Sequence, residues 1–162
     1  MNIADFLADN LGRADGMLKM TLADFTEAEM LVRPVPGANH TAWQLGHLIV
    51  SQQGMCTAVG AKLPELPAGF AERFTAKTAG VDDVSKLSSK AELLELLGRS
   101  SAAIGVWARA LKVEDLEKPG PEAMRAYAPT VGSLLSLSVG HLMMHMGQMQ
   151  VIRRKLGKPI LF

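Results

Sequence analysis

Residues 130–157 read TVGSLLSLSVGHLMMHMGQMQVIRRKLG, and this stretch decides the fold. Thr130 follows Pro129 and can cap the start of a helix, whereas Gly157 is a typical stop after its last turn. Apolar and small side chains recur between them every three or four residues, which is the period of a helix that buries one face. We expect the inward face to carry Leu134, Ser138, His141, His145, Gln148, Ile152 and Leu156.

Three earlier segments have the same period, and we expect helices at about Ile3–Met30, Asn39–Gly60 and Ser89–Leu111. Asn39 is the expected N-cap of the second helix, and Pro34 lies in the turn that ends the first. Ser89 and Glu92 form a capping-box pattern at the start of the third. We find no alternation of apolar and polar residues that would indicate a strand.

Four helices of this length predict an all-α protein, a four-helix bundle that occupies residues 1–162 as a single domain. The first connection is short, so we expect the first two helices to be antiparallel neighbours. Residues 61–88 form a much longer connection with several Pro and Gly residues. Such a connection usually crosses the bundle or covers a site, so we expect it to shape a pocket at the mouth of the bundle.

The composition excludes several classes of function. A formal net charge of +1 and 5% aromatic residues do not favour a nucleic-acid partner. No apolar run is long enough to cross a membrane. The single cysteine excludes an internal disulfide and the N-terminus does not resemble a secretory signal, so we expect a cytoplasmic protein with a small-molecule substrate.

Two histidines lie on the inward face of the last helix. A spacing of four residues turns the side chain by ~400°, so His141 and His145 are ~40° apart and one turn above the other. Such a pair can hold two positions of one metal ion, and His47 on the inward face of the second helix can supply a third. Nitrogen ligands suit zinc, nickel, copper or iron, of which we favour zinc or nickel, then iron.

The alternative interpretation of these residues is structural, because a histidine on an inward face can simply hydrogen bond to a buried neighbour. His40 is expected to be solvated at the start of the second helix, ~10 Å along the axis from His47 and too far to join it. Cys56 is turned by ~900° from His47, onto the opposite side of the helix. Neither His40 nor Cys56 is expected to be a ligand.

No catalytic residue can be assigned from the sequence. The His141–His145 spacing is that of a zincin motif, but the glutamate that would act as general base is absent from Leu142, Met143 and Met144. A basic cluster follows at the end of the helix, where cations oppose the negative end of the helix dipole. We expect that role for Arg153, Arg154, Lys155 and Lys158, and anionic substrate binding is the weaker alternative.

Two segments resemble one known family. Residues 141–159 read HLMMHMGQMQVIRRKLGKP and residues 33–48 read RPVPGANHTAWQLGHL. Both resemble the DinB/YfiT-like superfamily, whose last helix carries a His-x3-His pair followed by Gly-Gln, a basic pair and a Leu-Gly turn. The segment at residues 33–48 resembles the family's entry to the second helix and carries the third histidine, His47. The number of helices and the long middle connection also agree, so the resemblance covers nearly the whole chain.

The resemblance implies an up-down-down-up bundle with a long crossover between helices 2 and 3. It also implies a divalent metal site made by His47, His141 and His145, and a homodimer. Characterised relatives include enzymes that use a low-molecular-weight thiol, such as bacillithiol transferases and mycothiol-dependent maleylpyruvate isomerases. This chain lacks the acidic residues that some relatives carry beside the histidine pair.

We therefore expect a metal-dependent enzyme of the thiol-dependent S-transferase type, or a related hydrolase. Three neutral imidazoles would leave the ion charged and with at least one open position. A thiol there would be deprotonated, and a water there would have a pKa near ~7. The alternative is a non-catalytic helical bundle that binds a metal or another ligand, and an open position at the end of a pocket would distinguish the two.

Overall fold

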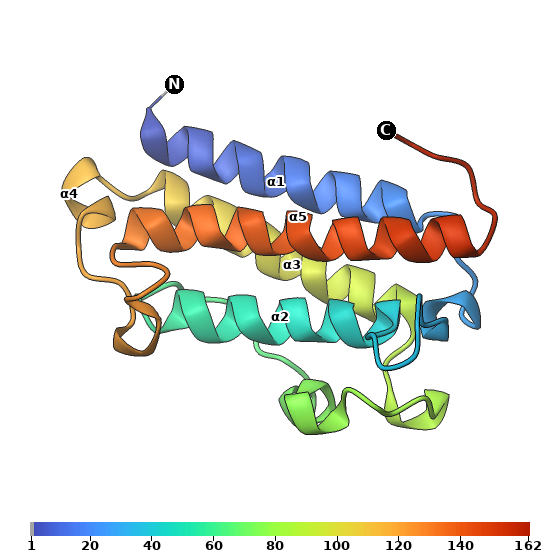
Figure 1. Cartoon of the computed structure of the whole chain (residues 1–162). Helices are drawn as coiled ribbons and strands as arrows, with labels where there is room; N and C mark the ends of the chain where they lie inside the picture. Colours follow the sequence, from blue (N-terminus) through green and yellow to red (C-terminus); the bar gives the residue numbers. More distant parts are fainter. Residues whose placement is uncertain (1) are drawn as a thin grey trace.

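The computed structural model describes residues 2–162, and its regular elements are all helical (Figure 1). Four long helices form the body of the molecule: α1 (Ile3–Leu22), α2 (Thr41–Thr57), α3 (Lys90–Arg109) and α5 (Val131–Lys155). The short helix α4 (Val113–Leu116), which the sequence did not predict, lies between α3 and α5. The described residues form no strand, only one isolated bridge between Pro119 and Thr130. The all-α prediction is confirmed.

The connections contain short 3-10 helices. The first connection holds η1 (Glu29–Leu31), and the segment before α5 holds η5 (Glu122–Met124). The long connection from α2 to α3 holds three, η2 (Ala71–Phe74), η3 (Ala76–Thr78) and η4 (Val84–Lys86), and it packs along α2 on the side away from α1 (Figure 1).

The long helices do not pack in the order of the chain. Both α1 and α2 pack mainly against α3 and α5, so α1 and α2 are not the direct neighbours that we expected. In Figure 1, α1 and α5 run from left to right, whereas α2 and α3 run from right to left. α1 and α2 are not neighbours because the first connection, from Ala23 to His40, is long enough for the chain to cross to the far side of the bundle.

The first helix is shorter than predicted because local side-chain contacts compete with its last turns. It ends at Leu22, and Phe25 then folds back into the core. Thr26 donates its backbone N–H to the Glu29 carboxylate at 2.7 Å, and the Thr26 hydroxyl accepts from the backbone N–H of Glu29 at 3.3 Å. This reciprocal pair closes a turn between α1 and η1, whose own N-cap, Ala28, makes no side-chain hydrogen bond.

Three predicted helix ends are confirmed. The Ser89 hydroxyl accepts from the backbone N–H of Glu92, and the Thr130 hydroxyl accepts from that of Ser133. Gly157 follows α5 with a φ of 70°, a conformation that glycine adopts without strain.

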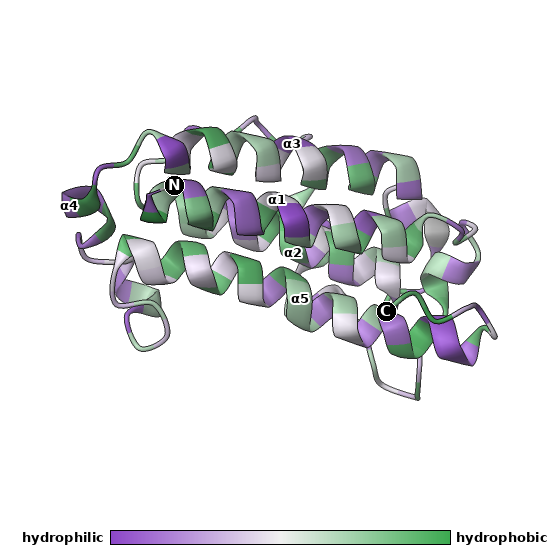
Figure 2. Cartoon of the chain, turned by 90° about the horizontal axis from the view of Figure 1, so that it is seen from above, coloured by the Kyte–Doolittle hydropathy of each residue, from purple (hydrophilic) through white to green (hydrophobic). Residues whose placement is uncertain are grey.

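A single apolar core lies between the four long helices, and polar and apolar residues are interspersed along each of them (Figure 2). Fully buried members include Leu18, Leu45, Leu97, Leu134 and Ile152. Within residues 2–162, none of the helices combines the length and the hydropathy that crossing a bilayer requires.

The basic cluster at the end of α5 has a different role from the expected one. Arg153 is 1% exposed, and its guanidinium donates to Asp24 and to the carbonyl oxygens of Thr21 and Pro159. This side chain therefore ties α5 to the end of α1 and to the C-terminal segment, rather than only opposing the helix dipole. Lys155 donates to the carbonyls of residues 33 and 34, so it also joins separate segments.

Candidate metal centre

The three histidines predicted as metal ligands lie together. His47 comes from α2, and His141 and His145 come from successive turns of α5, which packs against α2. The ring centroids are 4.8–5.3 Å apart. One candidate ligand nitrogen from each ring lies within 4.8 Å of the other two. The prediction that these residues converge is confirmed.

The spacing of the nitrogens fits a single ion. The Nε2 atoms of His141 and His145 are 3.1 Å apart. Two nitrogens that each lie ~2.1 Å from one ion are separated by ~3.0–3.4 Å at angles between 90° and the tetrahedral value. His47 faces both rings and supplies the third nitrogen from the opposite helix. A His₃ set of this kind accommodates zinc, nickel, copper or iron.

The electrostatics of the cluster keep the three rings neutral. Burial, followed by the effects of His141 and His47, lowers the pKa of His145 to about 4. Burial, followed by the effect of His47, lowers the pKa of His141 to about 4. Burial also lowers the pKa of His47. Neutral imidazoles are the form that binds a metal ion.

A glutamine fixes which nitrogen of His145 is free. The Gln44 amide Nε2 donates to the backbone carbonyl of Asn39 at 2.8 Å, which leaves Gln44 Oε1 facing His145 Nδ1 at 3.0 Å. Because Oε1 can only accept, Nδ1 carries the proton and Nε2 keeps its lone pair for a metal ion. Sequence reasoning missed Gln44, although its position one turn before His47 was a usable signal.

Trp43 holds the ring of His47. The two rings stack with centroids 5.0 Å apart and an interplanar angle of 5°. The indole N–H of Trp43 donates to the backbone carbonyl of Thr75 at 3.3 Å, which ties this stack to the long connection. The connection therefore supports the site from behind α2.

Gly46 allows the same connection to approach α2. A Cβ at this position would overlap the ring of Phe74, which is 2% exposed and packs against Phe70. Only glycine leaves room for that ring one residue before His47.

His40 is not solvated, contrary to our prediction, and it rather than Asn39 is the N-cap of α2. Its Nδ1 accepts from the backbone N–H of Trp43 at 3.1 Å, and its Nε2 donates to the carbonyl of Val81 at 2.8 Å. Both nitrogens are satisfied and the ring is fully buried, so the long connection covers a residue that the sequence suggested was exposed. As expected, His40 is outside the metal-type cluster.

Comparison with known proteins agrees with this arrangement. The sequence profile described as the DinB superfamily matches residues 10–149, which include all three histidines. The chain belongs to the DinB superfamily. No curated protein matches it significantly.

One solved structure has the same fold as this DinB-superfamily chain. The crystal structure of a conserved protein from Enterococcus faecalis superposes with a TM-score of 0.65, covering 98% of this chain and 99% of that one. At 19% sequence identity, this likeness concerns the fold alone.

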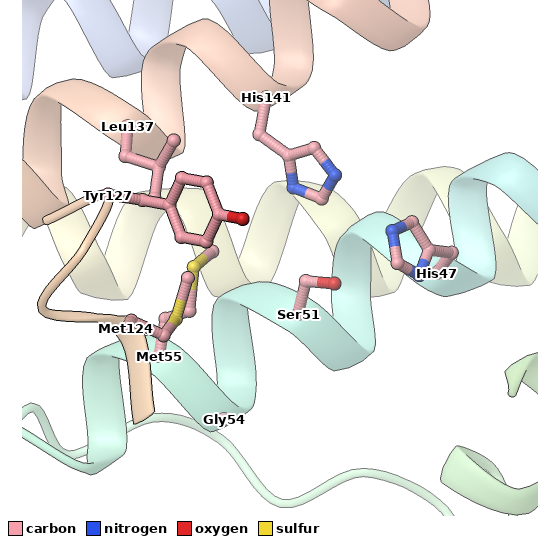
Figure 3. A pocket seen from close by; sticks show the side chains of 8 residues that line it. All are labelled: His47, Ser51, Gly54, Met55, Met124, Tyr127, Leu137 and His141. Carbon is pink, nitrogen blue, oxygen red and sulfur yellow. The ribbon is translucent and has the colours of Figure 1, made fainter. Parts of the chain in front are cut away.

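A pocket of about 500 Å³ opens beside the histidines (Figure 3). His47 and His141 lie at one end of it, whereas His145 is buried behind them. The other walls come from α2, α5 and the η5 segment, which contributes Met124 and Tyr127. The long connection does not line the pocket, so our prediction that it shapes the mouth was wrong. It packs on the N-terminal half of α2 instead, through Phe74 and the other contacts described above.

The cluster contains three ligand residues and no fourth. No further His, Cys, Asp or Glu joins it in the part of the chain that the structure describes. Cys56 is buried away from it, as the angular argument predicted, and burial raises the pKa of its thiol to about 11. Two of the three histidines, His47 and His141, line the pocket.

Proposed function

We propose that this DinB-superfamily chain is a metal-dependent enzyme of the thiol-dependent S-transferase type, built on an up-down-down-up four-helix bundle. One observation carries the proposal: His47, His141 and His145 lie together, and His47 and His141 also line a pocket. Structural zinc sites are normally closed by four protein ligands, whereas catalytic sites keep a position open for solvent or substrate. Three histidines beside a pocket, without a fourth protein ligand among the described residues, support the second arrangement.

The residues divide into ligands and supports. The three histidines would hold a divalent ion, with zinc or nickel preferred over iron, and Gln44 and Trp43 orient two of the rings. A bound ion would supply positive charge that favours the thiolate form of a thiol or the hydroxide form of water at neutral pH. Ser51 and Tyr127 contribute the two hydroxyl groups of the pocket lining, where they can hydrogen bond to a substrate.

The alternative is a non-catalytic bundle that binds a metal or another ligand. A site closed by a fourth protein ligand would favour this alternative, whereas a cluster of three histidines beside a pocket counts against it. Membership of the DinB superfamily does not decide between the two, because function depends on the site rather than on the fold.

The test of the proposal is a matrix of thiols and electrophiles. The purified chain without a histidine tag is loaded in turn with zinc, nickel and iron(II), and consumption of the thiol and electrophile is followed. We expect turnover with at least one combination and none with the metal-free chain or with His145→Ala. Metal binding without turnover across a broad matrix would support the non-catalytic alternative.

A further inference from the structure

The pocket beside the histidines has no charged side chain in its lining. Its walls are formed by apolar groups, including Met55, Met124 and Leu137, together with the aromatic ring of Tyr127. The hydroxyls of Ser51 and Tyr127 are the polar groups away from the histidines. In Figure 3 the Tyr127 hydroxyl points along the pocket, toward the side on which Ser51 and the histidines lie.

The nearest charges in the sequence do not enter the pocket. Glu122 and Arg125 flank Met124 in the η5 segment, but both are exposed and neither belongs to the lining. The Arg125 Nε donates to the backbone carbonyl of Gly120 at 3.3 Å, which holds this cation against its own loop. No Lys or Arg therefore belongs to the lining of the described pocket.

This lining discriminates between classes of ligand. An anion that enters an apolar pocket loses its hydration and must find a cation or several donors, or its binding is heavily penalised. Binding of a neutral apolar group in the same pocket is favourable, because apolar surface is removed from water. The volume, about 500 Å³, is in the usual range of small-molecule sites.

We propose that the pocket binds the neutral, apolar part of an uncharged small-molecule substrate, with its polar end directed to the histidine cluster and the Ser51 and Tyr127 hydroxyls. The inference rests on the proposed function for the identification of this ligand as a substrate. It assigns the pocket to the electrophile rather than to an anionic thiol. It also rejects the earlier alternative that the basic residues of this chain serve an anionic substrate here.

The test uses two fluorescent probes with the same ring system, one neutral and one anionic. N-phenyl-1-naphthylamine is neutral, and 8-anilinonaphthalene-1-sulfonate adds one sulfonate to the same scaffold. Each is titrated into the full-length chain, both metal-free and zinc-loaded, and the dissociation constant is taken from the rise in emission. We expect one site per chain for the neutral probe and, in the metal-free chain, at least ~10-fold weaker binding of the anionic one. A bound zinc ion would itself attract the sulfonate, so the difference should narrow in the zinc-loaded chain.

Two variants test whether the pocket is the place of binding. Leu137→Arg puts a cation in the lining from α5, and Met124→Arg does so from the η5 segment, in case the helix variant folds poorly. Either should weaken the neutral probe and strengthen the anionic probe, each by several-fold. Val151→Arg is the matched control, because Val151 is 53% exposed on the same helix and does not line the pocket. Circular dichroism shows whether each variant keeps its helices.

The probe experiment can contradict the pocket inference without contradicting the proposed function, and the reverse also holds. Equal or tighter binding of the anionic probe by the metal-free wild type would overturn the inference, as would no binding of either probe. The same response in Leu137→Arg and Val151→Arg would also overturn it. If the probes behave as expected but the chain binds no divalent metal, the proposed enzyme fails while the assignment of the pocket to neutral apolar ligands stands.

Discussion

Gln44 sets the tautomer of His145, and its removal should weaken metal binding. Leucine has a similar size but no acceptor, so Gln44→Leu leaves the buried Nδ1–H of His145 without a partner and its ring free to turn. Loss of such an outer-shell hydrogen bond typically lowers metal affinity ~10–100-fold. We expect that loss for zinc, measured by competition with a chromogenic chelator.

Gln52→Leu is the matched control for Gln44→Leu. Gln52 is 1% exposed on the same helix, and neither its amide nitrogen nor its amide oxygen has a protein partner. The substitution should leave zinc affinity unchanged and should not lower the free energy of unfolding, because it removes an unsatisfied group. If both variants lose affinity equally, the effect belongs to the packing of α2 and not to the His145 hydrogen bond.

The candidate ligands could be predicted from the sequence, but their supports could not. The His141–His145 pair follows from helical periodicity alone. The partners of Gln44 and His40 depend on contacts distant in the sequence, across 101 and 41 residues respectively. The position of His40 beside a predicted N-cap gives no indication that the long connection will cover its ring and accept a hydrogen bond from it.

Gly46 lets the long connection pack closely against α2, because its missing Cβ leaves room for the Phe74 ring. Gly46→Ala should force the Phe74 ring away from the helix, and an overpacked core position of this kind costs about 1–3 kcal/mol of unfolding free energy. The same movement should disturb Trp43 and His47, so zinc affinity should also fall. Chemical denaturation and the zinc competition assay measure the two effects.

Gly54→Ala is the control on the same helix. Gly54 is exposed, and an added Cβ would meet no atom within 4 Å. Replacing a helical glycine there should stabilise the protein by about 0.5–1 kcal/mol. A loss of stability in Gly54→Ala equal to that in Gly46→Ala would contradict the role given to Phe74.

The pair of Asp24 and Arg153 should make stability depend on pH. The hydrogen bond from Arg153 lowers the pKa of Asp24 below its usual value. The pair therefore contributes fully above the unfolded-state pKa near ~4, and the contribution is lost as the pH falls through the lower folded-state pKa. Asp24→Asn should cost about 1–2 kcal/mol at pH 7, less than for a fully buried pair because Asp24 is half-exposed.

The measurement is chemical denaturation of Asp24→Asn and wild type from pH 7 down to pH 3. The difference in unfolding free energy should be constant above about pH 5 and shrink toward low pH. Asp9→Asn provides the comparison, because the Asp9–Arg109 pair is exposed on both sides and should contribute less to stability than the Asp24–Arg153 pair. A difference for Asp24→Asn that does not change with pH would contradict the linkage.

At the scale of elements, the sequence predicted where the long helices lie better than it predicted where each helix ends and which helices pack together. Ser89, Thr130 and Gly157 carry their own local signals, so those ends were correct. The early end of α1 depends on the reciprocal cap of Thr26 and Glu29, which a continuous apolar period conceals. The pairing of α1 with α3 and α5 depends on where a long connection crosses, which periodicity does not encode.

For the whole molecule, we propose a homodimer that uses faces away from the metal centre. Several apolar side chains are exposed on α1 and α5, two helices that pack together: Phe6, Met20 and Met144. Light scattering at micromolar concentration should give twice the chain mass, and Met20→Glu combined with Met144→Glu should give the monomer mass. A monomer mass for the wild type would contradict the proposal.

The central claim is that three histidines hold one divalent ion in a fold that does not need it. A core of this size is stable without a metal, unlike a small zinc domain, although a bound ion adds stability by mass action. Loss of a ligand should weaken binding by more than the ~10–100-fold expected for an outer-shell residue. His145→Ala should therefore lose the ion and keep its helices.

The most direct measurement is a calorimetric titration of the metal-free, tag-free chain with zinc, run in parallel on His145→Ala, with circular dichroism of both proteins before zinc is added. The account predicts one ion per wild-type chain, no measurable binding by the variant at the same concentration, and equal helical content. Zinc binding by His145→Ala with wild-type affinity, or an unfolded metal-free wild type, would contradict it.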